Sequence, residues 1–99
     1  MENIDLDRIP TKKPGIVSRI LESEIPQQTE GVLVLPNKGE VKIINEVGAR
    51  IWSLIDGEKS IREIVAIICS EFEVSSVVAE IDTLSFVTEL VKREIISLE

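Results

Sequence analysis

The sequence predicts an α+β fold with a three-stranded antiparallel sheet followed by three helices. Before position 45, apolar residues alternate or cluster in short runs that proline and glycine interrupt, which is typical of β-strands. After position 45, apolar residues recur every three or four positions, as on one face of an amphipathic helix. Because strands and helices occupy separate parts of the chain, this order favours the α+β class.

Residues 1–15 are predicted to form an extended N-terminal arm, which precedes one folded domain over residues 16–99. Pro10 and Pro14 remove backbone donors and disfavour helix in the arm. A chain of 99 residues with 43% apolar content can bury a single small core. We therefore expect one domain and a short extension.

The three strands are expected between residues 15 and 44. Residues 15–25 are rich in β-branched side chains, which favour strands. Residues 31–35 and 40–44 flank a turn at residues 36–39, where proline, asparagine and glycine favour a hairpin. Lys42 lies in the middle of the last strand, and a lysine there commonly guards a free edge. We therefore expect residues 40–44 to form an edge of the sheet.

Each of the three helices has a recognisable start. Asn45 can cap the first, and Ser60 with Glu63 fits a capping box for the second. The third is expected from about residue 75 to residue 93, and residues 95–99 form a short strand or a packed tail. Two short helices and a long one, backed by a small sheet, indicate a winged-helix-like arrangement.

The charge of the chain argues against two classes of partner. The net charge is −7, whereas nucleic-acid-binding proteins carry a basic face and anionic membranes attract basic segments. The first residues do not form a signal peptide, and no apolar run is long enough to span a membrane. A single cysteine fits a reducing compartment. The expectation is a cytoplasmic protein without a nucleic-acid or membrane partner.

Few side chains in this sequence can carry chemistry. Histidine is absent and Cys69 is the only cysteine, which excludes the His and Cys clusters of transition-metal sites. Cys69 lies beside the apolar stripe of the second helix, which favours a buried and inert thiol. The glycines are scattered and form no phosphate-binding loop. We therefore expect a protein that is not an enzyme and has no catalytic, metal or cofactor site.

The junction between the last strand and the first helix holds two unusual residues. Gly48 falls in the first helical turn, where the missing side chain lets the helix approach the sheet closely. Trp52 follows one turn later and can cover the junction with a large rigid surface. Both residues are therefore predicted to hold the scaffold together and not to bind a ligand.

The last helix has more apolar surface than a single core-facing stripe requires. One arc holds Val77, Ile81, Leu84 and Val91, extended by Val87, and a second arc holds Ala79, Phe86 and Leu90. If the helix is wedged between the other helices and the sheet, both arcs are buried. Alternatively, one arc lines a groove beside the sheet and is available to a partner.

Residues 16–98 resemble the PqqD family, whose members are small peptide-binding modules also called RiPP recognition elements, after the ribosomally made, modified peptides they serve. The resemblance is carried mainly by "INEVGARIWSLIDGEKSIREIVAIICSEFEV" and by "REIISLE" at the end of the chain. The residues that match the family pattern are Asn45, Val47, Gly48, Ala49, Ile51, Trp52, Leu54, Gly57, Ser60, Ile64, Phe72, Val74, Asp82, Phe86, Val87 and Leu90. The strand "EVKIIN" lacks the aromatic residues that members often carry there, and Arg93 and Glu94 stand where a glycine is common.

This resemblance implies a function for the edge strand and the last helix. The leader segment of a precursor peptide would add as a strand to the edge, because a free edge beside an apolar helix groove captures extended peptides. The residues expected to contact the peptide are Glu40, Val41, Lys42, Ile43, Ile44, Ile81, Leu84, Ser85, Thr88 and Val91. The module would present the peptide to a modifying enzyme, which in pyrroloquinoline quinone biosynthesis is of the radical S-adenosylmethionine (SAM) type. The module itself would hold no cofactor. It would be a monomer or weak homodimer.

Two other functions stay open on the sequence alone. Winged helices often bind DNA, so a nucleic-acid-binding or regulatory protein is one alternative, which the acidic composition opposes. A structural oligomerisation subunit is the other, with the apolar groove filled by another copy of the chain.

Overall fold

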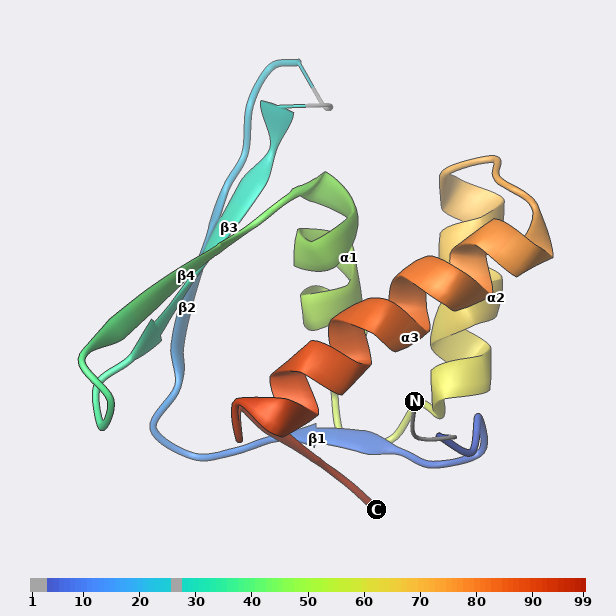
Figure 1. Ribbon diagram of the computed structural model, residues 1–99. Coiled ribbons are helices and arrows are strands. Elements are labelled where there is room, and N and C mark those ends of the chain that lie inside the picture. The colour runs from blue at the N-terminus through green and yellow to red at the C-terminus, as the bar shows by residue number, and fades with distance from the viewer. Residues whose placement is uncertain (1–3, 26–27) are drawn as a thin grey trace.

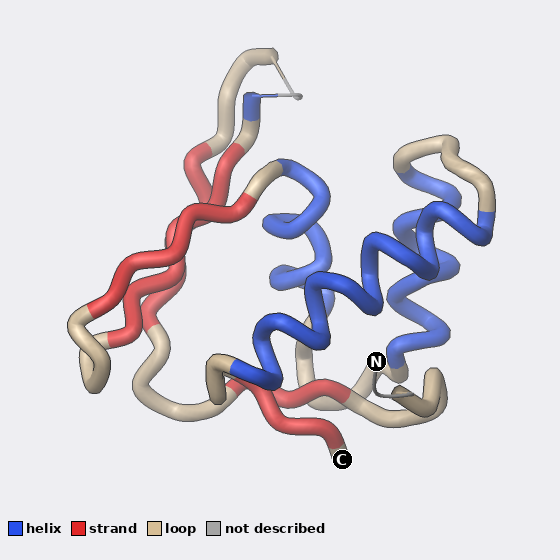
Figure 2. The backbone as a smooth tube through the Cα atoms, in the orientation of Figure 1, coloured by secondary structure: helices blue, strands red, loops and turns tan. Residues whose placement is uncertain are grey.

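The computed structural model describes residues 4–25 and 28–99 and confirms the α+β fold (Figure 1, Figure 2). In chain order the elements are β1 (Pro10–Lys12), β2 (Val17–Leu21), β3 (Glu30–Leu35), β4 (Glu40–Ile44), α1 (Glu46–Leu54), α2 (Ile61–Glu71), α3 (Ser76–Lys92) and β5 (Ile96–Leu98). A three-stranded antiparallel sheet stands on one side of the molecule, and α3 crosses in front of α1 and α2 on the other (Figure 1).

The main sheet has the strand order β2-β3-β4, with both neighbouring pairs antiparallel. The turn between β3 and β4 places Gly39 at φ 64°, a conformation that glycine adopts without strain. The predicted hairpin and the predicted edge position of residues 40–44 are therefore confirmed. Among the described residues, no strand pairs with the second side of β4.

The register of β4 decides which way its lysine points. Lys42 pairs with the fully buried Leu33 and shares its face, so its side chain points toward the helices and is only 17% exposed. Val41 and Ile43 lie on the opposite face and are 64% and 66% exposed. If Lys42 guards the edge, it does so as an inward-pointing charge. A strand alternates strictly, so the buried Ile44 fixes Lys42 on the inner face as well.

A second, two-stranded sheet joins the two ends of the chain. Strand β1 pairs antiparallel with β5, so the last residues form a strand, one of the two outcomes expected for them. The Arg8 guanidinium donates from Nη2 to the Leu98 carbonyl at 2.7 Å, and the Ile61 N–H donates to the Arg8 carbonyl at 3.0 Å. Within the predicted arm, only Pro10–Lys12 forms a strand, and turns at residues 6–7 and 14–15 flank it. The segment is bonded to both α2 and β5. Residues 1–3 lie outside the described residues.

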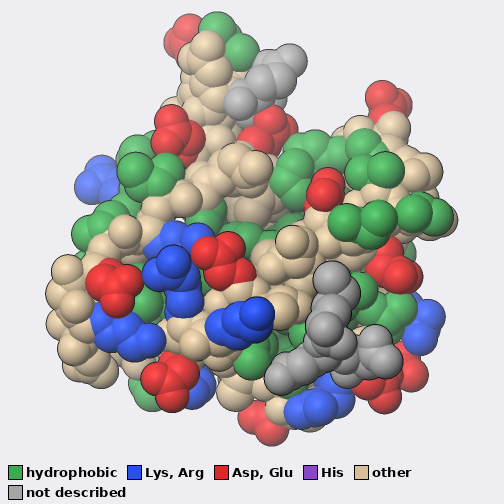
Figure 3. Space-filling view, in the orientation of Figure 1, with side chains coloured by type: hydrophobic (Ala, Val, Ile, Leu, Met, Phe, Trp, Pro, Cys, Tyr) green, Lys and Arg blue, Asp and Glu red, His purple; other side chains and the backbone are tan. Residues whose placement is uncertain are grey.

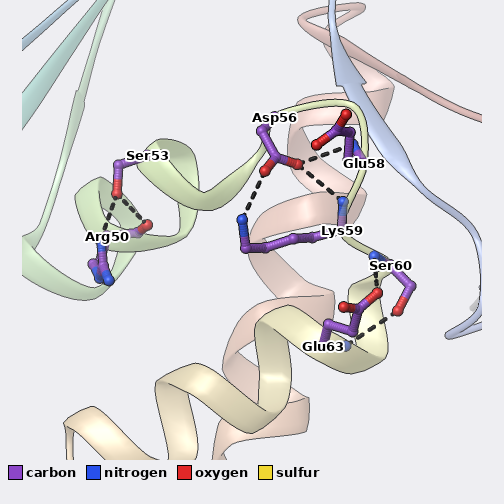
Figure 4. A network of polar contacts seen from close by, with 7 residues as sticks. All are labelled: Arg50, Ser53, Asp56, Glu58, Lys59, Ser60 and Glu63. Atoms are coloured by element: carbon purple, nitrogen blue, oxygen red, sulfur yellow. Dashed lines mark hydrogen bonds and ion pairs between the residues drawn. The ribbon is translucent and has the colours of Figure 1, made fainter.

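The helix starts are formed by the caps that the sequence predicted. The Gly48 N–H donates to Asn45 Oδ1 at 2.8 Å, and Ser60 and Glu63 make both bonds of a capping box (Figure 4). In the loop between α1 and α2, Lys59 donates to Asp56 from its side chain and its backbone, which holds the pKa of Asp56 well below its ordinary value (Figure 4). Local hydrogen bonds therefore set the lengths of α1 and α2.

One face of α3 packs on the core, and its residues come from both of the apolar arcs described above. Ala79, Thr83, Val87 and Leu90 are fully buried, whereas Val77 and Ile81 are 65% and 61% exposed. The core-facing stripe therefore combines most of the second arc with Val87. The first arc is divided: Leu84 and Val91 pack half-buried against the core, and the N-terminal half faces solvent.

Candidate functional site

Strand β4, helix α1 and helix α3 meet closely at Gly48. A Cβ atom at this position would lie 3.1 Å from Phe86 Cε1 on α3 and 3.3 Å from Ile44 Cβ on β4. Both distances are tighter than ordinary van der Waals contact, so a side chain here would push the three elements apart. The close approach predicted for Gly48 is confirmed, and it involves α3 as well as the sheet.

A cavity of about 290 Å³ opens beside this junction. Its lining residues are Asn45, Val47, Gly48 and Ile51 from the β4–α1 segment and Asp82, Ser85, Phe86 and Glu89 from α3. The lining therefore combines apolar groups from both segments with polar side chains, three of which are on α3: Asp82, Ser85 and Glu89. Figure 1 shows β4 leading directly into α1. The cavity lies next to the end of the edge strand, because Asn45, the residue directly after β4, is part of its lining.

Ion pairs join β4 to the C-terminal half of α3. Lys42 Nζ lies 2.7 Å from Glu89 Oε1, and Arg93 Nη1 lies 3.3 Å from Glu40 Oε2. Arg93 Nε also lies 3.4 Å from Glu89 Oε1. The hydrogen bond from Lys42, together with the nearby positive charges, lowers the pKa of Glu89 below its ordinary value. Figure 3 shows Lys and Arg side chains next to Asp and Glu side chains on this face of the molecule. Between β4 and α3, these ion pairs therefore lie toward the start of β4, and the cavity lies at its end.

The predicted contact residues on β4 all lie at the edge of the sheet, but their side chains face two ways. The side chains of Glu40, Lys42 and Ile44 are on the inner face, toward α3 and the cavity, and those of Val41 and Ile43 are on the outer face. The outer pair can therefore contribute only backbone groups to a ligand held between β4 and α3.

The predicted contact residues on α3 are not gathered at the cavity. Ser85 lines it, and Ile81 is exposed. Leu84, Thr88 and Val91 are half-buried and are not among the residues that line it. The helix turns a different face toward β4 from the one that its apolar arc suggested, because Ala79, Thr83, Val87 and Leu90 take the core.

Sequence reasoning did not assign three α3 residues that line the cavity: Asp82, Phe86 and Glu89. Asp82 and Phe86 are among the residues that match the family pattern, so a signal for them was present in the sequence. Glu89 carried no such signal, since its place in the site depends on the ion pair with Lys42.

Trp52 does not line the cavity and belongs to the core, with 2% of its surface exposed. The ammonium group of Lys12 lies 4.5 Å from the centre of its ring, a distance at which a cation is attracted to the ring face. Burial lowers the pKa of Lys12. Among the described residues the indole Nε1 has no hydrogen-bond acceptor. These features favour the scaffold role predicted for Trp52.

Within residues 4–25 and 28–99, no group of three or more acidic, Cys or His side chains is arranged to hold a metal ion. No helix in the same ranges is long and apolar enough to cross a membrane. The thiol of Cys69 is half-buried and donates to the Val74 carbonyl at 3.1 Å. The cavity and the free strand edge are therefore the features that suit a binding function.

Comparison with known proteins finds a matching family model and similar solved structures. The family model "Coenzyme PQQ synthesis protein D (PqqD)" matches residues 30–96. The structure described as "TbiB1 in Complex with the TbiA(beta) Leader Peptide" has 31% sequence identity and a TM-score of 0.71, over 88% of this chain and 94% of that one. No curated protein matches the chain.

The fold is also that of the PqqD truncation of Methylobacterium extorquens PqqCD, a structure solved by NMR in solution and described as a functional, stand-alone RiPP recognition element. That structure has 18% identity and a TM-score of 0.68, over 90% of this chain and 88% of that one. The family match, which spans more than half of the sequence, and the identity to TbiB1 agree: the chain belongs to the PqqD family.

Proposed function

We propose that this protein binds the leader segment of a ribosomally made precursor peptide and presents it to a modifying enzyme. The observation that carries the proposal is the unpaired edge of β4, which lies beside an open cavity on α3. A chain that is 31% identical has been solved with a leader peptide bound, which supports the same kind of ligand here.

The peptide would bind by adding a fourth strand to the sheet next to β4. Backbone N–H and C=O groups of residues 40–44 would form the ladder, so most of the affinity would not depend on side-chain identity. Alternate peptide side chains would point toward α3, on the face that already holds Lys42 and Ile44. Those side chains would select the peptide and its register.

On α3, Ser85 and Ile81 are the proposed contacts from the predicted set, because one lines the cavity and the other is exposed at the surface. We assign Thr88 a place at the margin of the groove and give Leu84 and Val91 a supporting role through their packing on the core. The cavity residues Asp82, Phe86 and Glu89 join the proposed site.

We propose further that the protein is not itself catalytic and that the chemistry and its cofactors belong to the partner enzyme. A radical SAM enzyme is the candidate partner, as the resemblance to PqqD implies. The proposed place of action is the cytoplasm, where precursor peptides are made, and the proposed state is a monomer or weak homodimer. Co-purification with the modifying enzyme encoded nearby, and size measurement at several concentrations, test these points.

NMR titration with the leader of a precursor peptide encoded beside the gene tests the binding site. Amide shifts should cluster on residues 40–44 and on the cavity residues of α3. Shifts confined to α2, or to the segment around β1, would show that the peptide does not add to β4. A peptide of the same composition in scrambled order is the control.

Self-association is a second candidate function, and the outer face of the sheet favours it. This face exposes four apolar side chains: Val17, Leu21, Val41 and Ile43. Apolar patches of this kind often mark protein contacts. If copies associate through this face, Val17→Glu, on β2 at the opposite edge of the sheet, should lower the mass measured at high concentration and leave peptide affinity unchanged.

A further inference from the structure

The cavity beside β4 is placed to receive one particular side chain of an added strand. Ile44 is on the inner face of β4, and its Cβ lies 3.3 Å from the position that a Gly48 Cβ would occupy. A peptide residue that lies beside Ile44 with its side chain on the same face therefore points toward the lining of the cavity. The next inward side chain, two residues along, lies beside Lys42.

Four of the residues that line the cavity offer it apolar side chains or bare backbone. Gly48 contributes only backbone, Val47 and Phe86 are half-buried, and Ile51 is buried. A straight chain of methylene groups can lie along such a surface and bury its apolar area. These four residues would therefore accept the stem of a long side chain as well as a purely apolar one.

The wall that α3 contributes is acidic. Asp82, Ser85 and Glu89 follow one another at spacings of three and four residues, which puts them on one side of the helix. No lysine or arginine is among the residues that line the cavity. Glu89 is already held by Lys42 and Arg93, whereas Asp82 is exposed and makes no ion pair within the described residues. A cation in the cavity would meet an unpaired carboxylate, and an anion would be repelled by it.

We propose that the strand captured by β4 carries a lysine or arginine on its inward face, with the stem over Gly48 and Phe86 and the cationic group beside Asp82. This inference rests on the proposed function, since it names the kind of peptide that the same groove selects. The acidic net charge of the chain, −7, acts in the same direction by attracting basic peptides before they dock.

The test is a selection from a display library of randomised linear peptides, made against the full chain and against Asp82→Lys. The wild-type protein should enrich lysine or arginine at one position of the selected peptides. Asp82→Lys should lose that preference and favour aspartate or glutamate at the same position. Replacing the selected lysine by norleucine, which keeps the stem and removes the charge, should weaken binding to the wild-type protein by up to about fivefold, the upper end for an exposed ion pair.

Glu80→Lys is the matched control. It makes the same change of charge on the same helix, but Glu80 lines the separate groove with Leu6 and Cys69. It should select the same peptides as the wild-type protein. The inference is overturned if the wild type selects only apolar side chains at the inward position, or if Glu80→Lys changes the preference as much as Asp82→Lys does.

Failure of the proposed function gives a different result. In that case the library yields no binder at all, or its binders keep their affinity when proline is placed at each of positions 42 and 43. Either outcome removes the strand-addition model and this inference with it. Binders that require the strand edge but carry no basic residue remove the inference alone.

Discussion

Gly48 shows how one missing side chain places three elements. A Cβ at this position would meet Phe86, Asn45 and Ile44 from three sides, at 3.1, 3.2 and 3.3 Å. The Asn45 oxygen is also the cap that accepts from the Gly48 N–H, so it cannot move away without losing that bond. The glycine therefore fixes both the start of α1 and the width of the cavity.

We expect Gly48→Ala to destabilise the protein by about 1 kcal/mol. Overpacking costs about 1–3 kcal/mol, and the better helix propensity of alanine returns roughly 1 kcal/mol. Chemical denaturation followed by circular dichroism measures the difference. An alanine variant more stable than the wild type would show that Phe86 and Ile44 yield freely and that the close approach has no structural importance.

Trp52→Ala should loosen or unfold the domain, because truncation of a buried tryptophan costs roughly 3–5 kcal/mol. That is a large share of the stability of a small domain. A thermal melt, run beside a peptide titration, measures the effect. If the variant kept its melting temperature and lost only peptide binding, Trp52 would be a ligand contact and the scaffold assignment would be wrong.

At the scale of elements, the sequence is a good guide where local hydrogen bonds decide and a poor guide where packing decides. The caps at Asn45 and Ser60 depend on neighbouring residues, and both were predicted. The inward side of Lys42 depends on the register with Leu33, and a shift of one residue would have exposed it. The face that α3 turns toward β4 likewise depends on which of its apolar residues the core accepts.

The edge of β4 has one set of outward-facing N–H groups, and paired proline variants identify it. Adjacent residues of an antiparallel strand direct their N–H groups to opposite sides. Of Lys42→Pro and Ile43→Pro, one should therefore abolish peptide binding and keep the hairpin, and the other should break a bond to β3 and destabilise the fold. Isothermal titration with a melt for each variant separates the two effects.

Lys42→Ala is the control for the proline pair, since it keeps the backbone donor and removes only the side chain. It should weaken peptide binding modestly. A complete loss of binding in this variant would mean that the peptide is held by the lysine side chain and not by the strand edge.

The link between β4 and α3 should depend on pH through Glu89. Its pKa is lowered in the folded protein, chiefly by the hydrogen bond from Lys42. The stabilisation is therefore fully present above the ordinary carboxyl pKa and is lost as the pH falls through the lowered value. Glu89→Gln should cost less than about 1 kcal/mol at neutral pH, because the pair is partly exposed.

The difference in stability between Glu89→Gln and the wild type should shrink as the medium becomes acidic. Denaturation curves at a series of pH values measure it. A difference that stayed constant down to the acid range would mean that the amide disturbs packing and that the ion pair contributes nothing.

At the scale of the whole molecule, the two ends of the chain close the bottom of the helical layer. The β1–β5 pair lies below α3 in Figure 1, and the segment before β1 is bonded to the start of α2 through Ile61 and Arg62. Pro10 is fully buried. The sequence suggested an arm because Pro10 and Pro14 favour extended backbone, and nothing local to those residues indicates that the segment meets β5, which lies at the far end of the chain.

Removal of the predicted arm, residues 1–15, should therefore destabilise the whole domain. The deletion takes away the partner of β5, the acceptors of the Ile61 and Arg62 N–H groups, and the lysine over Trp52. The loss of the β1–β5 hydrogen bonds and of the packing over Trp52 should cost several kcal/mol, comparable with the total stability of a small domain. Calorimetry of the truncated and full chains measures it. Lys12→Ala separates the cation over the ring from the strand pairing and should cost about 1 kcal/mol or less. If the truncated chain melted at the same temperature as the full chain, residues 1–15 would be an independent arm, and the β1–β5 pairing would contribute nothing to the stability of the domain.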